Sequence, residues 1–155
     1  MSKRKVIGWA VLGLLGGVQF IRPSRNNDGN LPGSAFVQLY GVPDSVNRIL
    51  QLACYDCHSN NTCYPWYTNI QPLGWILANH VRKGKSNLNF SEFDRYPLRR
   101  QISKLKAIAG EIEDNEMPLK SYKLLHKKAR LSAEEKYLIV SWMRNKADSI
   151  SNIGR

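Results

Sequence analysis

Residues 54–58 read Cys54-Tyr55-Asp56-Cys57-His58, a Cys-x-x-Cys-His run that brings two thiols and one imidazole together. On a helix the two cysteines lie three positions apart and share one face. Each thiol can then form a thioether with one of the two vinyl groups at the edge of a porphyrin, and His58 can bind the iron as proximal ligand. The run therefore predicts haem c, held covalently, one per chain.

The same residues leave other uses open: a redox dithiol, a structural disulfide or a zinc site. A thioredoxin-like dithiol belongs in a βαβ unit, and no strand-rich segment surrounds the run. Zinc could take Cys63 as a fourth ligand, but the neighbouring Cys57 and His58 side chains diverge by about 100° on a helix. We expect haem, and a zinc-binding interaction module stays an alternative.

The amino terminus has the layout of an export signal or a signal anchor. A basic cluster at residues 3–5 precedes an uncharged stretch at residues 6–21, which Arg22 and Pro23 close. No small-residue cleavage site follows, so the sequence favours an uncleaved membrane anchor, residues 1–22, over a cleaved signal. As a helix the stretch is about 24 Å long, a little short of the hydrocarbon core, so the flanking cations would have to snorkel.

The rest of the chain is predicted to hold one domain. Residues 23–41 are rich in Asn, Gly, Pro and Ser and are predicted to be a linker. Residues 42–149 are long enough for a single core, which a haem would help to fill, and residues 150–155 form a flexible tail.

Helical periodicity runs through this domain, and strand patterns are almost absent. Asp44 is predicted to cap a helix that carries the cysteines on its apolar stripe. Pro72 is expected to open a second helix that ends at Arg82, just before Gly84. Further helices are expected over residues 98–112, over residues 122–129, and from Ser132, which forms a capping box with Glu135. The sequence thus predicts an all-α, cytochrome c-like helical domain around one haem.

A six-coordinate haem needs a second axial ligand, and the chain offers Met117, His80 and His126. Pro118 keeps Met117 off the preceding helix, so its thioether lies on a loop that could cross the haem. A His/Met pair is the c-type arrangement that raises the reduction potential, and Met117 is therefore the expected distal ligand. His80, in the middle of a helix, is the alternative, and His126 among lysines is expected to be a solvated surface residue. Met117 could otherwise simply fill the core.

The chain also resembles a family of small exported bacterial proteins that carry a haem-binding domain. The likeness covers about residues 20–147 and rests on the stretches 20–23, 54–62, 64–67, 88–91 and 117–118, followed by Tyr122, His126, Ala129 and Leu131. It implies a mostly helical, c-type cytochrome-like module with covalently held haem, and it implies no reaction. Together with the anchor, it leads us to expect a single-pass protein of the bacterial inner membrane with its haem domain in the periplasm, or a soluble periplasmic protein if the signal is cleaved. Cys63 stands where the family varies, and we expect it to be a small buried residue, with a mixed disulfide or a contact with the haem edge as the alternative.

Two functional classes follow. The first is an electron-transfer protein, not an enzyme, in which His58 and Met117 hold the iron in both oxidation states. The second is a gas sensor or small peroxidase with an open distal position near a polar group such as His80 or His126. The net charge of +11 favours acidic redox partners or anionic headgroups, and an exported chain is not expected to meet nucleic acid.

Overall fold

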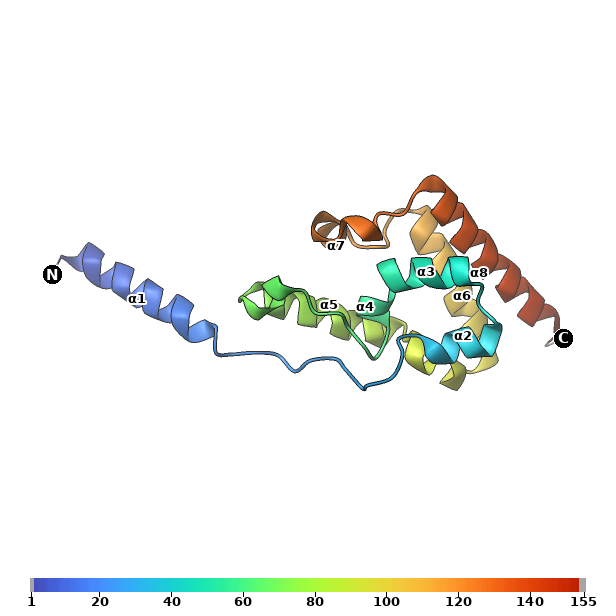
Figure 1. The fold of residues 1–155 in the computed structure, drawn as a ribbon, viewed down its shortest axis with the longest axis horizontal. Coiled ribbons are helices and arrows are strands. Elements are labelled where there is room, and N and C mark those ends of the chain that lie inside the picture. Colours follow the sequence, from blue (N-terminus) through green and yellow to red (C-terminus); the bar gives the residue numbers. More distant parts are fainter. Residues whose placement is uncertain (1, 154–155) are drawn as a thin grey trace.

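The computed structural model describes residues 2–153, and in this range the regular elements are helices (Figure 1). They are α1 (Lys3–Val18), α2 (Ser34–Tyr40), α3 (Asp44–Ala53), α4 (Tyr55–His58), η1 (Trp66–Asn69), α5 (Leu73–Asn87), η2 (Phe90–Arg95), α6 (Leu98–Glu113), α7 (Lys120–Leu125), η3 (Lys127–Ala129) and α8 (Ala133–Ile153). Residues 2–153 contain no β-strand, only an isolated bridge between Asn27 and Asn61. The all-α prediction is confirmed.

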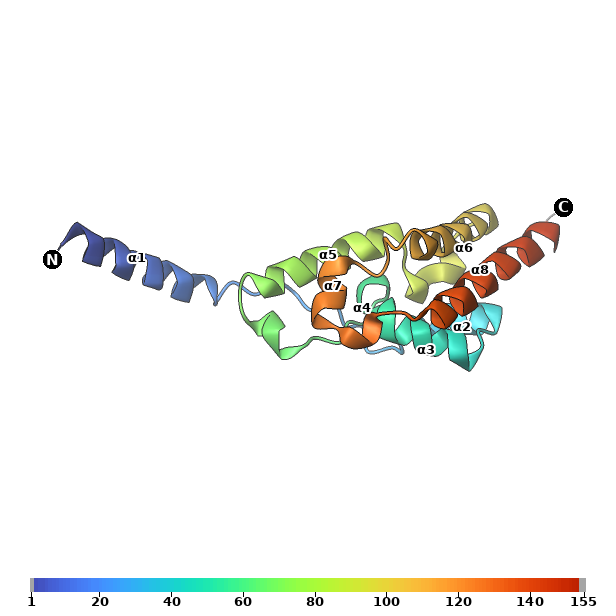
Figure 2. The same ribbon diagram turned by 90° about the horizontal axis from the view of Figure 1, so that it is seen from above.

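Helices α6 and α8 pack along each other at the end of the molecule that lies away from α1 (Figure 2). The predicted apolar stripe of α6 buries Leu105, Ile108 and Ile112, and α8 contributes the completely buried Ile139 and Met143. These side chains recur every three or four residues, so each helix turns one face to the other.

The predicted capping box starts α8. The Ser132 N–H donates to Glu135 Oε2 at 2.8 Å, and the Glu135 N–H donates to Ser132 Oγ at 3.2 Å. Both residues come directly before or within the first turn, where helix N–H groups lack partners inside the helix.

An aromatic cluster joins this core to the Cys-x-x-Cys-His run. Phe36 of α2 is completely buried, and its ring centroid lies 4.9 Å from Phe90 and 4.8 Å from Phe93. Phe90 in turn contacts Tyr55, the second residue of the run, at 5.3 Å between centroids. Burying rings of this size contributes about 1.5–3 kcal/mol each, so Tyr55 fixes α4 to the core.

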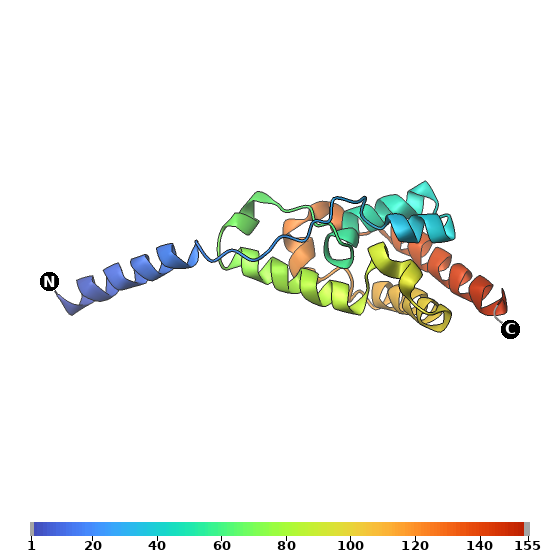
Figure 3. The ribbon, with the colours of Figure 1, turned by 90° about the horizontal axis from the view of Figure 1, so that it is seen from below.

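The predicted linker over residues 23–41 is wrong in its second half. Residues 34–40 form α2, and Phe36 makes this helix part of the core, which therefore begins before residue 42. The helix has only seven residues, and only Phe36 among them is buried, so it is too short to show a period that sequence reasoning could detect. Figure 3 shows the chain between α1 and α2 running along the molecule, past α5.

The predicted membrane anchor is also wrong. Residues 3–18 do form a helix, α1, which stands away from the other helices and buries none of its residues (Figure 1). Within residues 2–153, however, no helix has both the length and the apolar character needed to cross a membrane. Three of the sixteen residues of α1 are the cations at positions 3–5, so its uncharged part is only about 20 Å long, against roughly 30 Å of hydrocarbon. The expected placement as a single-pass inner-membrane protein is overturned with it.

The predicted tail, residues 150–155, is helical as far as it is described. Helix α8 continues to Ile153, and residues 154 and 155 lie outside the described range. The side chain of Ile150 packs against the core, which explains why the helix extends beyond the predicted domain end at residue 149.

Candidate functional site

The two thiols lie at a joint between two helices and not on one continuous helix. Cys54 ends α3 and begins α4, with φ of −123° and ψ of −45°, outside helical values. The Cys54 carbonyl nevertheless accepts from the N–H groups of Cys57 at 3.2 Å and His58 at 3.0 Å. These two backbone bonds close a single helical turn that carries all three residues of the predicted site.

The imidazole of His58 is held by two carbonyl oxygens. Its Nδ1 lies 3.0 Å from the oxygen of Gly84 and 3.1 Å from that of Leu88, both at the end of α5. Because carbonyls only accept, Nδ1 carries the proton and Nε2 keeps its lone pair. A metal-binding histidine is oriented in this way, and Nε2 is thus prepared to bind iron.

Gly84 makes this arrangement possible. A Cβ added there would lie 2.5 Å from the Cys57 carbonyl oxygen and 3.1 Å from the Cys57 Cβ, a contact that real side chains do not make. The absent side chain lets the backbone of α5 lie against α4, which brings the Gly84 and Leu88 oxygens to His58. Sequence reasoning assigned Gly84 to a helix stop, but α5 continues to Asn87.

Cys54 and Cys57 are half-buried free thiols with little tendency to ionise. Burial raises the pKa of Cys54 to about 12, with a smaller contribution from the charge of Cys57. Burial also raises the pKa of Cys57 to about 11, and the Asp56 carboxylate adds to this. A reactive redox dithiol has the opposite property, a lowered thiol pKa, so these values argue against the dithiol alternative. Burial lowers the pKa of His58, against two hydrogen bonds that raise it, which favours the neutral ring that a metal needs.

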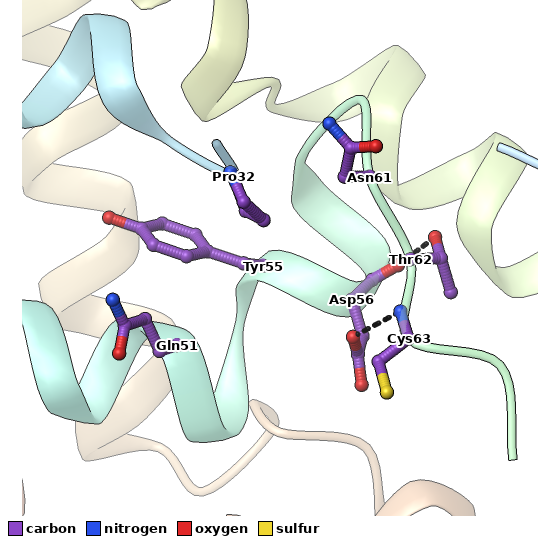
Figure 4. A pocket seen from close by; sticks show the side chains of 7 residues that line it. All are labelled: Pro32, Gln51, Tyr55, Asp56, Asn61, Thr62 and Cys63. Atoms are coloured by element: carbon purple, nitrogen blue, oxygen red, sulfur yellow. Dashed lines mark hydrogen bonds between the residues drawn. The ribbon is translucent and has the colours of Figure 1, made fainter. Parts of the chain in front are cut away.

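Polar contacts fix the loop that follows His58. The Thr62 hydroxyl donates to the Asp56 carbonyl at 2.6 Å, and the Cys63 N–H donates to Asp56 Oδ1 at 2.9 Å (Figure 4). The Asn26 amide, from the predicted linker, donates to Ser59 O and to Thr62 Oγ1, each at 2.9 Å. These contacts hold the loop over residues 59–62 in place.

A hydrogen-bonded chain leads from the run to α7. Asp56 Oδ2 accepts from the Tyr122 hydroxyl at 2.5 Å, and the Tyr122 ring stacks on His126 at 3.9 Å between centroids. Nδ1 of His126 donates to the Tyr122 carbonyl at 3.1 Å, so Nε2 accepts from the Tyr67 hydroxyl at 3.2 Å. Burial, then the bond to Asp56, raises the pKa of Tyr122. The expectation that His126 is a solvated surface residue is wrong, because both of its nitrogens have protein partners.

Met117 directly follows a helix end of the Schellman type. Asn115 is left-handed, with φ of 60°, its N–H donates to Ile112 O at 3.2 Å, and the Glu116 N–H donates to Glu111 O at 3.0 Å. The Met117 N–H shares the same Glu111 oxygen at 3.0 Å, which fixes the backbone at the candidate ligand. The Met117 side chain is half-buried.

The remaining predicted ligands lie elsewhere. His80 is half-buried on α5, one turn before Gly84. Cys63 is exposed, contrary to expectation, and lines a hollow of about 240 Å³ together with Asp56 (Figure 4). Among residues 2–153 no three His, Cys, Asp or Glu side chains are grouped to hold a metal ion, so the four zinc ligands of the alternative are not assembled.

Sequence reasoning found the three donors of the run and missed the groups that orient them. The Gly84 and Leu88 oxygens carry no side-chain signal, and Tyr122 with its bond to Asp56 comes from a helix 66 residues away. Only the spacing of Tyr122 and His126, four positions apart and thus on one face of a helix, could have indicated that they act together.

The donor set suits a haem: two neutral thiols for the vinyl groups, and an imidazole whose Nε2 is free for iron. In comparison with known proteins, a family described as haem-binding domain matches residues 13–145, which include the run and Met117. No match was found among curated proteins or among solved structures. Since the match covers most of the chain, the protein belongs to the haem-binding domain family, with haem as its cofactor.

Proposed function

We propose that the protein is a monohaem electron carrier in which Cys54 and Cys57 hold haem c covalently and His58 and Met117 bind its iron. The orientation of His58 carries this proposal. Two carbonyl oxygens on Nδ1 leave Nε2 as the only nitrogen of this ring available to a metal, and His58 follows Cys57 directly in the chain.

Burial supports Met117 as the distal ligand. The alternative to a ligand role is that Met117 only fills the core. Met143 has that role and is completely buried. The Met117 side chain remains half-buried although it follows a fixed helix end. A thioether held at a defined backbone position and not used in packing suits a ligand role.

The position of α5 speaks against His80. The two nitrogens of an imidazole point in divergent directions, so a helix that accepts from Nδ1 of His58 lies on the far side of that ring from the iron. His80 belongs to this same helix, near Gly84, and a distal ligand must come from the opposite face of the haem. His126 is engaged through Nε2 by Tyr67 and has no free lone pair to offer.

When bound, a haem with two permanent axial ligands takes up and releases single electrons without a change of ligands. The protein groups then only have to bind and orient. The carbonyls of Gly84 and Leu88 hold the proton on Nδ1 of His58. The contact of Tyr55 with the core fixes α4. The Asp56 contacts with Cys63 and Tyr122 tie the following loop and α7 to α4. No general base is needed for this function.

Absorption spectroscopy tests the ligand pair. The reduced protein, made in a host with haem-attachment machinery, is expected to show a low-spin, six-coordinate spectrum that Met117→Ala converts toward high spin. Met143→Ala is the control, because it creates a core cavity that costs about 2–5 kcal/mol and leaves the ligands in place. A high-spin wild-type spectrum would refute the electron carrier and favour the gas sensor or peroxidase. Mass spectrometry without a haem adduct would refute the covalent attachment.

A further inference from the structure

A cluster of cations covers α7 and η3, the segment tied to the Cys-x-x-Cys-His run. We define the α7–η3 basic surface as Lys120, Lys123, Lys127, Lys128 and Arg130, of which all but the half-buried Lys123 are exposed. Residues 117–133 contain no Asp or Glu. The three ion pairs among residues 2–153 lie elsewhere, joining Arg95 to Glu92, Lys106 to Asp148 and Arg144 to Glu113. The positive charge of this surface is therefore not neutralised within the described protein.

The surface has an apolar centre. Lys120, Lys123 and Leu124 lie at helical spacings of three and four, and with Arg130 they line a shallow hollow of about 300 Å³. The Leu124 side chain is 71% exposed, and the adjacent Leu125 is 56% exposed. Arg130 is held in place, because its Nε donates to the Lys123 carbonyl at 3.0 Å. An exposed leucine ringed by cations fits a partner that presents an apolar side chain flanked by carboxylates.

The surface is also coupled to the site. Helix α7 reaches the run through the 2.5 Å bond from Tyr122 to Asp56, and the segment between α7 and η3 reaches η1 through the bond between His126 and Tyr67. Figures 1 and 2 place α7 at the same end of the folded part as α4 and α5. A protein bound to α7 would thus sit close to the residues that hold the haem.

We propose that the α7–η3 basic surface docks an acidic protein that exchanges electrons with the haem, an inference that rests on the proposed function. A hollow of this size receives one projecting side chain, which a protein offers and a flat lipid surface does not. Its small extent suits the small, transient interfaces of electron-transfer complexes, in which charge complementarity sets the association rate.

The test uses the full-length haem-loaded protein and a fluorescein-labelled peptide with one leucine between two runs of three glutamates. Binding is followed by fluorescence anisotropy at rising salt. The variant of the α7–η3 basic surface, called the patch variant below, is Lys120→Glu/Lys123→Glu/Arg130→Glu. The matched control, Arg22→Glu/Lys83→Glu/Arg99→Glu, makes the same charge change at exposed positions on other segments. Absorption spectra confirm that each variant keeps its haem, and the glutamine versions of the patch positions serve if the glutamate variant does not fold.

We expect binding that weakens with salt, an affinity loss of about tenfold or more in the patch variant, and a change below about twofold in the control. Equal losses in both variants would show an effect of net charge alone and would overturn the proposal, as would absence of binding to the wild type. Tighter binding to vesicles of equal parts phosphatidylcholine and phosphatidylserine would assign the surface to lipid and overturn it too. Because anisotropy needs no electron transfer, a protein that binds the peptide but does not cycle between oxidation states would contradict the proposed function and not the docking surface.

Discussion

The contact between α4 and α5 leads to a sharp prediction for Gly84→Ala. The added methyl group would lie 2.5 Å from the Cys57 carbonyl oxygen, a backbone atom that cannot rotate away. Overpacking of this kind costs about 1–3 kcal/mol, and the better helix propensity of alanine returns up to about 1 kcal/mol. We expect a net loss of about 2 kcal/mol, since the contact is severe.

Gly110→Ala is the matched control, because Gly110 also lies within a helix, α6, and nothing lies within 4 Å of its added Cβ. There the propensity gain acts alone and should stabilise the protein by about 0.5–1 kcal/mol. The two variants should differ by about 3 kcal/mol, which corresponds to roughly 10 °C in the melting temperature of a chain of this size. Thermal unfolding of the haem-loaded proteins, followed by circular dichroism, measures this difference.

The reduction potential gives a second, independent readout of Gly84→Ala. Moving α5 away from α4 lengthens the bonds from His58 Nδ1 to the Gly84 and Leu88 oxygens. The imidazole then becomes a less basic ligand, which disfavours the ferric state and raises the potential. Equal melting temperatures in the two variants would refute the packing argument. A lower melting temperature with an unchanged potential would show that α5 packs on α4 but does not tune His58.

Three further changes probe the contacts around the site and its distant helix. Tyr122→Phe removes the 2.5 Å bond to the Asp56 carboxylate and should lower the free energy of unfolding in urea by about 1.5–3 kcal/mol, whereas Tyr137→Phe, at a ring that is 77% exposed, should be neutral. Ser132→Ala breaks the capping box of α8 and should cost about 1 kcal/mol in the same measurement, with no change in the haem spectrum. In the haem-loaded protein iodoacetamide should alkylate the exposed Cys63 alone, so mass spectrometry that finds three modified cysteines would contradict covalent attachment.

Features that depend on neighbours in the chain could be predicted from the sequence. The Cys-x-x-Cys-His run, the apolar stripe of α6 and the capping box each involve residues at most a few helical turns apart, and spacing alone determines which of their groups can meet. The run identified haem as the cofactor, and the match to the haem-binding domain family confirms it. The prediction of a membrane anchor at the amino terminus was wrong although it also used a local pattern, because the apolar stretch lacks the length that a membrane requires.

Only the tertiary structure decided how the donors are held. The amino-acid type at positions 84 and 88 says nothing about where their carbonyl oxygens point, so the orientation of His58 depends on how closely α5 approaches α4. Likewise, the bond from Tyr122 to Asp56 closes across 66 residues, and Phe36 enters the core from a helix too short to show a period. Contacts of this kind depend on how segments distant in the chain pack together in the core, and the local sequence of each segment does not determine that packing.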